Sequence, residues 1–424
     1  MKIRSLRGMK DILPPEVYVW QSIEEKTREF LENHGYKEIR TPLLEEISLF
    51  RQSIGEGTDI VNKEMYDFTD KGGRHVALRP EGTAPIVRAY IENAMGESDF
   101  LKLYYIGPMF RSERPQKGRS RQFHQIGVEA IGHSGAYIDA GLIFMMAGLL
   151  KNIGLSAFKI KLCSLGCAKD KQKFAKELRE FLLPEQNRLC DNCKIRLEKN
   201  VLRTLDCKVE SCKSLLRNSP KAKDFLCPDC AAHYSKVKEL LTTHTPVDFK
   251  EDAGMVRGLD YYTGIVFVVT HSGTGAQDAI AAGGRYDNLV EDFGGKKTEA
   301  IGFAIGMERL VMALSPEKKM KLEKNRELEV YTATTGSNVC DEAYKTMEPF
   351  RDSLFCEINY DPKKSLKSQL RQANKKNARL VVIFGDEELK RGEIVLRNMK
   401  TSEQRNIKTS ELRKELSTEL KKEF

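Results

Sequence analysis

Residues 105–132 read YIGPMFRSERPQKGRSRQFHQIGVEAIG, and this stretch decides the fold of the first half of the chain. Two apolar-rich segments of strand-like composition flank a polar loop, which is typical of a β-hairpin. The loop carries a single acid, Glu113, against five cations: Arg111, Arg114, Lys117, Arg119 and Arg121. Because like charges repel at this density, we expect a polyanion to bind here. The planar guanidinium fork is well matched to phosphate.

The second strand of this hairpin adds an amide and an acid. In an extended segment successive side chains point to opposite faces, so Gln125, Gly127 and Glu129 share one face. The hairpin therefore offers cations to a nucleotide and a carboxylate to a small cationic or amine-bearing ligand. This combination predicts an enzyme that couples ATP chemistry to a small polar substrate.

The bulk composition indicates a globular protein. The chain has 424 residues, 40% of them hydrophobic and 31% charged, and a net charge of +9. This length predicts two or three domains, and the basic excess is compatible with nucleic acid without establishing it. The longest apolar run, 141–150, is about half of the roughly 18–20 residues that span a bilayer. The N-terminus has no apolar core of signal-peptide length, so we expect a cytoplasmic protein without a membrane partner.

The hydrophobic pattern predicts an irregular alternation of helices and strands in the front part of the chain. A helix is expected between the Pro14-Pro15 pair and Gly35. The expected strands are 36–44, 76–79, 158–162, 265–270 and 279–282, and the further helices are 83–93, 138–153 and one that starts at residue 307.

A Lys- and Cys-rich stretch interrupts this pattern, and a second Lys-rich stretch, 316–326, is expected to be a linker. Beyond it, strands at 328–332, 355–360 and 380–384 alternate with helices, which predicts βα units around a mostly parallel sheet. The expected fold class is α+β, with an antiparallel sheet core flanked by helices, a Cys-rich insertion and a C-terminal α/β domain. The expected domains are 1–325, the insertion 168–246 within it, and 326–424.

Four motifs resemble those of histidyl-tRNA synthetases, a family of class II aminoacyl-tRNA synthetases. They are LRPEGT at 78–83, FRSERPQKGRSRQFHQ at 110–125, RGLDYYTG at 257–264 and GFAIGMERL at 302–310. The resemblance extends from RGMKDILPPE at 7–16 to SLKSQLRQANKKNARLVVIFGDEEL at 365–389, so it covers nearly the whole chain. Each motif alone is weak, whereas their combination is highly specific.

The resemblance implies a class II sheet that holds ATP and a C-terminal domain similar to the anticodon-binding module. It implies a histidine–tRNA ligase that uses ATP and Mg²⁺. Such an enzyme activates L-histidine to histidyl-adenylate with release of pyrophosphate, and then transfers histidine to the 3′ end of its tRNA. In this family the first helix and the segment YKEIRTPLLE at 36–45 belong to a dimer interface, which implies a homodimer.

By resemblance, three arginines carry the catalysis. Arg111 matches the family arginine that contacts the α-phosphate, and Arg309 matches the one that holds the far end of the triphosphate. Glu113 belongs to the same ATP-binding hairpin motif. Arg257 matches an arginine that takes the place of a metal ion on the side opposite Arg111. The phosphate gains negative charge during activation, so these groups are expected to orient it and to stabilise that charge.

The resemblance also implies a histidine pocket. Glu81, Thr83 and Gln125 are implied to surround the α-amino group, and Glu129 and Tyr262 to bracket the two imidazole nitrogens. A carboxylate and a phenol complement the donor and the acceptor edges of that ring. The full set implied to contact histidine is Glu81, Gly82, Thr83, Arg111, Gln125, Glu129, Arg257, Tyr261 and Tyr262.

The hairpin loop has a second implied role. In this family the loop reaches the acceptor stem of histidine tRNA, and Arg114 and Gln116 are the residues implied to contact it. A solvated charged loop without a specific partner is the competing interpretation.

Six of the ten cysteines lie in the insertion: Cys190, Cys193, Cys207, Cys212, Cys227 and Cys230. The first two and the last two form CxxC pairs, whose short spacing suits a tetrahedral thiolate site. We therefore expect a structural Zn²⁺ held by Cys190, Cys193, Cys227 and Cys230. Two alternatives stay open: Cys207 and Cys212 as ligands in another pairing, and reduced thiols without metal.

Two rival functions use some of the same features. A non-catalytic histidyl-synthetase-like subunit that regulates ATP phosphoribosyltransferase typically lacks the C-terminal domain and has eroded site motifs. This chain keeps both. A plain tRNA-binding protein would give no role to Glu81 and Glu129, since acids repel nucleic acid.

Overall fold

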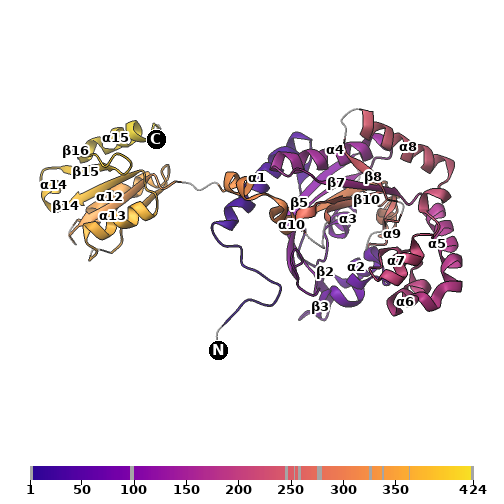
Figure 1. Cartoon of the computed structure of the whole chain (residues 1–424). Coiled ribbons are helices and arrows are strands. Elements are labelled where there is room, and N and C mark those ends of the chain that lie inside the picture. Colours follow the sequence, from indigo (N-terminus) through magenta and orange to yellow (C-terminus); the bar gives the residue numbers. More distant parts are fainter. Residues whose placement is uncertain are drawn as a thin grey trace. The chain divides into compact units, whose positions relative to one another are not determined.

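The computed structural model divides the chain into two compact units. Unit 1 is Met1–Glu323 and unit 2 is Lys324–Phe424 (Figure 1). The structure describes residues 3–95, 100–243, 247–252, 254–255, 259–274, 279–323, 327–336, 339–361 and 363–421.

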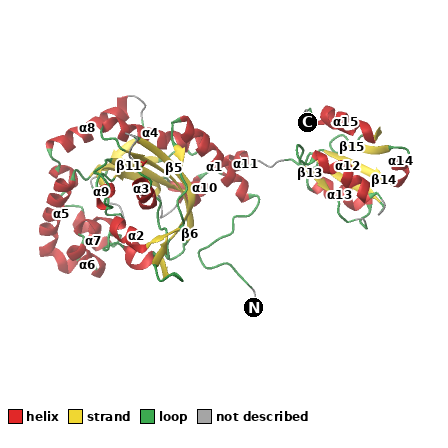
Figure 2. Cartoon of the chain, turned by 180° about the vertical axis from the view of Figure 1, so that it is seen from behind, coloured by secondary structure: helices red, strands yellow, loops and turns green. Residues whose placement is uncertain are grey.

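Unit 1 is built on an eight-stranded sheet with the order β1-β5-β6-β11-β10-β9-β7-β8. The six central strands, β5, β6, β11, β10, β9 and β7, pair antiparallel with their neighbours. At the two edges, short β1 pairs parallel with β5 and short β8 pairs parallel with β7. The bounds are β1 Lys37–Glu38, β5 Leu101–Phe110, β6 Gln122–Ile131, β7 Lys159–Ser164, β8 Phe249–Glu251, β9 Thr263–Thr270, β10 Ala279–Arg285 and β11 Ala300–Gly306. The expected antiparallel sheet core is confirmed, and helices surround it (Figure 2).

Side-chain alternation along the strands gives each face of this sheet its own core. In β9, Phe267 and Val269 belong to the first core, whereas Val266 and Val268 belong to the second. The first core packs against α1 Glu16–Asn33, α4 Ala136–Ile153, α8 Pro228–Thr243 and α10 Met307–Ala313. The second core packs against α3 Thr83–Glu92, α9 Leu289–Asp292 and the insertion helices.

Helix α4 is longer than the apolar run 141–150 and extends beyond it at both ends. By length and composition it is the one helix among the described residues that could cross a membrane, and 61% of it is buried in the fold. The charged residues Asp139 and Lys151 lie on either side of the apolar run in the sequence, but both are part of the helix. Its packing in the first core accounts for its apolar composition.

The Cys-rich insertion leaves the sheet after β7, and its described residues form helices joined by short loops, without strands. It gathers along one side of unit 1 (right in Figure 1) and returns through α8 to β8 at the sheet edge. Its elements are α5 Ala168–Leu182, η3 Leu183–Arg188, α6 Asp191–Lys199, η4 Val201–Asp206, α7 Glu210–Leu216, η5 Ala222–Phe225 and then α8.

The single strand expected over 36–44 is wrong, because the chain changes sheets within it. β1 ends at Glu38, and β2 Leu44–Glu46 joins a separate three-stranded sheet with β4 His75–Leu78 and β3 Tyr66–Thr69. Pro42 lies between the two strands, where its lack of an N–H removes no ladder hydrogen bond. This small sheet packs beside α2 Ile47–Ile54 and the π-helical turn η1 Ile60–Glu64.

The linker expected at 316–326 is wrong for most of its length, because α11 Pro316–Leu322 is a helix of unit 1. Ser315 caps its start by accepting a hydrogen bond from the Lys318 amide. Ser22 Oγ on α1 donates to the Leu322 carbonyl at 2.6 Å, which ties the helix end to the first core.

Unit 2 is a five-stranded sheet of order β13-β12-β14-β15-β16 with helices packed on it. β12 pairs parallel with β13 and β14, but β14, β15 and β16 pair antiparallel, so the expected mostly parallel sheet is only half right. Segments 393–398 and 404–408 are joined by too few residues for a crossover, so they form a hairpin. The bounds are β12 Val330–Thr335, α12 Cys340–Met347, η7 Glu348–Phe350, β13 Cys356–Ile358, α13 Leu366–Lys375, β14 Leu380–Gly385, α14 Asp386–Lys390, β15 Glu393–Asn398, β16 Gln404–Lys408, η8 Thr409–Glu411 and α15 Leu412–Leu420.

Candidate active site

A cavity opens on the second-core face of the large sheet, where the hairpin β5–β6 meets β10 and β11. The space inside it, with the open mouth included, is about 1020 Å³. All four sequence motifs contribute lining residues to it. Two of them adjoin through the pairing of β6 with β11, which places Gln125 beside Gly306 and Glu129 beside Gly302. The expected site residues that line it are Glu81, Thr83, Arg111, Glu113, Gln125, Tyr261, Tyr262 and Arg309.

Glu129 lies beneath the cavity and is held by two hydroxyl groups. Thr83 Oγ1 donates to Glu129 Oε1 at 2.7 Å, and the Tyr286 hydroxyl donates to Oε2 at 2.5 Å. The residue is only 1% exposed. A Cβ at Gly302 would overlap the Glu129 carboxylate, so this strand position accommodates only glycine without movement.

Burial raises the pKa of Glu129 to about 8, and repulsion from Glu81 adds to this effect. The hydrogen bonds from Tyr286 and Thr83 act in the opposite direction. Burial also raises the pKa of Glu81. Burial therefore destabilises the ionised form of both carboxylates. A ligand that brings a positive charge or hydrogen-bond donors stabilises that form, so the site favours such a ligand.

Glu81 also fixes the start of α3. Its carboxylate accepts hydrogen bonds from the backbone amides of Thr83 at 3.0 Å and Ala84 at 2.8 Å, and from the Tyr261 hydroxyl at 3.2 Å. A side-chain oxygen at this position satisfies amides that have no partner within the helix. Glu81 therefore both caps the start of α3 and forms part of the cavity wall.

Gly82 and Gly127 make room for an aromatic ring that the sequence analysis did not assign to the site. A Cβ at either glycine would overlap the ring of Tyr105. The Tyr105 hydroxyl donates to Gln125 Oε1 at 3.4 Å, so it orients that amide at the cavity wall. Gly82 itself is not among the residues that line the cavity.

The loop that carries Tyr261 and Tyr262 is held from the insertion. Lys171 on α5 donates to the carbonyl oxygens of Asp260 at 2.7 Å and Tyr262 at 3.0 Å. Asn200 Nδ2 donates to Asp260 Oδ1 at 2.9 Å. Burial lowers the pKa of Lys171, against the attraction of Asp260.

The outer part of the cavity is lined by cations with fixed orientations. Arg111 Nε donates to the Pro80 carbonyl at 2.9 Å, and its guanidinium lies 5.3 Å from the centre of the Phe123 ring. Arg309 donates to the carbonyls of Gly118 at 2.9 Å and Ala279 at 2.8 Å. These contacts set the plane of each guanidinium before an anion binds.

Glu113 lies among the arginine residues of the outer part of the cavity. Its carboxylate pairs with Arg119 at 2.5 Å and lies 3.9 Å from Arg111. Arg114 and Gln116 are exposed on the hairpin loop and do not line the cavity. Arg257 lies outside the described residues, although Leu259 in the same motif lines the cavity.

Residues that shape the site but were not predicted from the sequence include Tyr105, Phe123, Lys171, Tyr286 and Glu308. Tyr105 could have been found, because period-2 alternation and antiparallel pairing place it opposite Gly127 on the site face. Tyr286 and Lys171 gave no signal, since a tyrosine after a strand and a lysine on an amphipathic helix usually have structural or solvated roles.

The structure separates the two CxxC pairs, so the predicted ligand set Cys190, Cys193, Cys227 and Cys230 is wrong. Cys190 immediately precedes α6, whereas Cys230 lies in the first turn of α8, which follows η4, α7 and η5 along the chain. Two groups of potential metal ligands result, each with its ligand atoms within 4.8 Å of one another. They are Cys190, Cys193, Cys207 and Cys212, and Cys167, Asp170, Cys227 and Cys230.

Comparisons with known proteins identify the relatives of this chain. A family model described as histidyl-tRNA synthetase matches residues 8–310, and one described as anticodon binding domain matches 329–419. A histidine–tRNA ligase from Thermodesulfovibrio yellowstonii is 50% identical over 95% of this chain and 96% of its own length.

Solved structures show the same fold. The apo histidyl-tRNA synthetase of S. aureus is 32% identical with a TM-score of 0.79, over 97% of this chain and 98% of that one. A protein from Bacillus halodurans C, described as an ATP phosphoribosyltransferase regulatory subunit/histidyl-tRNA synthetase, shares the fold at 22% identity and a TM-score of 0.65, over 91% of this chain and 99% of that one. Since the family model spans most of the chain and a relative half identical to it covers nearly all of it, the chain belongs to the histidyl-tRNA synthetase family.

Proposed function

We infer that this chain is a histidine–tRNA ligase, which activates L-histidine with ATP to histidyl-adenylate and pyrophosphate and then transfers histidine to the 3′ end of its tRNA. The observation that carries this inference is one cavity with two opposite environments. Buried Glu129 lies under one part, and the guanidinium groups of Arg111 and Arg309 line the other. A carboxylate recognises the ring N–H of histidine, and the guanidinium groups recognise the triphosphate.

Histidine binds with its ring toward Glu129 and its amino group toward Glu81, Thr83 and Gln125. The imidazole N–H donates to the carboxylate of Glu129, and the Tyr262 hydroxyl donates to the other ring nitrogen. An amino acid that lacks these nitrogens leaves buried polar groups unpaired. A site that hydrogen-bonds its substrate in this way rejects such analogues by about 10⁴-fold or more.

Activation forms a bond between the histidine carboxylate oxygen and the α-phosphorus of ATP, and it breaks the bond to pyrophosphate. Arg111 stabilises the charge that develops on the α-phosphate, and Arg257 is proposed to act on the opposite side. Arg309 holds the departing pyrophosphate. Because the contacts to Pro80 and Phe123 already orient Arg111, no reorganisation is needed as the charge develops.

Mg²⁺ has oxygen donors available beside these arginines. Glu113 and Glu308 line the same cavity, and carboxylates together with phosphate oxygens suit this hard cation. When bound, the ion neutralises part of the triphosphate charge. Glu308 also accepts hydrogen bonds from the His124 amide at 3.0 Å, so the protein fixes its orientation.

The remaining parts of the proposal concern tRNA and assembly. Unit 2, which matches the anticodon-binding family model, binds the anticodon region, and Arg114 and Gln116 contact the acceptor stem. Two chains form a homodimer through α1 and residues 36–45. The enzyme works in the cytoplasm without a membrane partner.

ATP–pyrophosphate exchange with each standard amino acid tests this function, followed by charging of histidine tRNA. We expect exchange with histidine alone and stable aminoacylation of that tRNA. Absence of exchange with histidine, in protein that binds it, would favour the regulatory-subunit alternative.

A further inference from the structure

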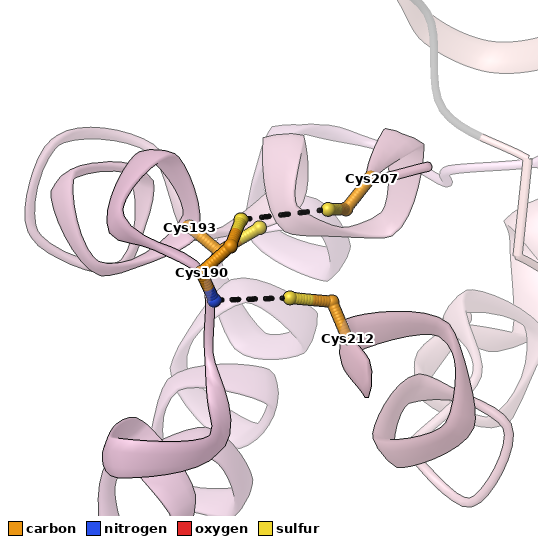
Figure 3. A group of neighbouring side chains, drawn as sticks. All are labelled: Cys190, Cys193, Cys207 and Cys212. Atoms are coloured by element: carbon orange, nitrogen blue, oxygen red, sulfur yellow. Dashed lines mark hydrogen bonds between the residues drawn. The ribbon is translucent and has the colours of Figure 1, made fainter. Parts of the chain in front are cut away.

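Four cysteines of the insertion come together from three short elements (Figure 3). Cys190 immediately precedes α6 and Cys193 lies in its first turn, so the CxxC spacing directs both sulfur atoms to one side. Cys207 directly follows η4, and Cys212 lies within α7. Helices this short are not stable by themselves, and here they share the second hydrophobic core, of which Leu197, Leu202 and Leu216 are members.

The sulfur positions fit a tetrahedral thiolate site. All four sulfur atoms lie within 4.8 Å of one another, and they converge on one space in Figure 3. The Sγ atoms of Cys190 and Cys207 are 3.8 Å apart. A tetrahedron with Zn–S bonds of about 2.3 Å has sulfur–sulfur edges of about 3.8 Å.

The surroundings of the four cysteines favour a closed site. Cys193 and Cys212 are fully buried, Cys207 is 8% exposed and Cys190 is half-buried. The Cys190 amide donates to Cys212 Sγ at 3.2 Å, a contact that stabilises a thiolate. Structural zinc sites have four protein ligands and exclude water, whereas catalytic sites keep a position open.

We propose that Cys190, Cys193, Cys207 and Cys212 bind one structural Zn²⁺ ion, and that Cys227 and Cys230 are not ligands of this ion. Each thiol releases its proton to solvent on binding, which leaves a zinc–thiolate centre of net charge −2. The ion fastens α6, η4 and α7 together.

This fastening extends to the catalytic part of unit 1. Asn200, between α6 and η4, donates to Asp260 of the loop that carries Tyr261 and Tyr262. Arg196 on α6 pairs with Asp59 at 3.0 Å, just before η1. A metal-stabilised module therefore supports the wall of the cavity from outside, without contributing a ligand to the substrate.

The second group of potential ligands, Cys167, Asp170, Cys227 and Cys230, differs from the four-cysteine group in its ligand types. Variants of it therefore serve as a matched control for the zinc measurements. Asp170 already caps the start of α5 by accepting a hydrogen bond from the Cys167 amide at 3.3 Å. Its three cysteines are only half-buried, and a carboxylate replaces the fourth sulfur. A metal bound there would have three sulfur ligands and one oxygen ligand.

Zinc content tests the proposal on the full chain, purified under reducing conditions without chelator. We expect the wild type to hold at least one zinc ion per chain. Cys190→Ser/Cys193→Ser should lose one equivalent, and the matched variant Cys227→Ser/Cys230→Ser should keep the equivalent that the first variant loses. Only traces of zinc in the wild type, or full zinc content in Cys190→Ser/Cys193→Ser, would overturn the proposal.

The zinc coordination shell provides a measurement that does not depend on how Cys190→Ser/Cys193→Ser folds. X-ray absorption at the zinc edge of Cys227→Ser/Cys230→Ser should show four sulfur atoms at about 2.3 Å. A shell with oxygen, or with fewer than four sulfur atoms, would contradict the proposed ligand set. Neither measurement requires aminoacylation activity, so the result stands apart from the proposed ligase function.

Discussion

Glu129 makes the stability of the protein depend on pH in a direction that is unusual for a carboxylate. Burial raises its pKa in the folded state to about 8, above the ordinary value of 4.5. The folded state therefore holds the proton more tightly than the unfolded chain does. Its contribution to stability is present at low pH and is lost as the pH rises from about 5 through 8.

The substitution Glu129→Gln removes this ionisation and isolates its effect. We expect the melting temperature of the variant to rise relative to that of the wild type between about pH 5 and pH 9 without ligand, because the wild type alone loses stability there. Histidine-dependent exchange should fall by about 100-fold or more, since a neutral amide oxygen accepts a hydrogen bond from the ring more weakly than a carboxylate does. A constant difference in melting temperature across this range would show that Glu129 does not titrate.

Arg111 depends on the planar shape of its guanidinium as well as on its charge. The contacts to the Pro80 carbonyl and the Phe123 ring require a fork that an ammonium group lacks. We expect Arg111→Lys to reduce kcat for pyrophosphate exchange by about 10²–10³-fold with the Kd for histidine little changed. Arg114→Lys, on the exposed loop, is the control and should leave exchange intact. Equal losses in both variants would indicate a general effect of loop charge.

At the scale of elements, helix α5 positions the loop that carries Tyr261 and Tyr262. Lys171 satisfies the carbonyl oxygens of Asp260 and Tyr262. In Lys171→Met these carbonyls lose their donor, at a cost of about 1–3 kcal/mol for each buried group. We expect the KM for histidine to rise about 10-fold or more in pyrophosphate exchange, with the KM for ATP changing less.

Lys169→Met is the matched control for this experiment, because Lys169 lies on the same helix and is exposed. It should leave both KM values unchanged. If Lys171→Met also binds histidine normally, the loop does not depend on α5 for its position.

The sequence predicts an element well when the residues of that element alone determine its structure. The hairpin β5–β6 and helix α1 have strong local patterns, and both are confirmed. The break at Pro42 and the helical start of the expected linker depend on what each segment packs against, which periodicity does not report. The cysteine grouping has the same origin: spacing predicts that each CxxC pair faces one side, but only the packing of η4 and α7 decides which other cysteines join it.

At the scale of the whole molecule, the two units have separate interiors. Among the described residues, the hydrophobic clusters of unit 1 end at Leu322 and those of unit 2 begin at Leu328, with no member in common. The cavity draws all its lining residues from unit 1. Each unit is therefore expected to fold alone, with the chemistry of activation in the first.

A chain that ends at Glu323 tests this division of labour. We expect histidine-dependent pyrophosphate exchange to stay within a few-fold of the full chain, because no cavity residue is removed. Charging of histidine tRNA should fall by about 100-fold or more, equivalent to roughly 3 kcal/mol of lost binding, since the anticodon contacts proposed for unit 2 are gone. Exchange serves as the internal control for folding. Loss of both activities in a folded fragment would mean that unit 2 supports the catalytic cavity as well as the tRNA, and full charging would mean that it does not bind the tRNA productively.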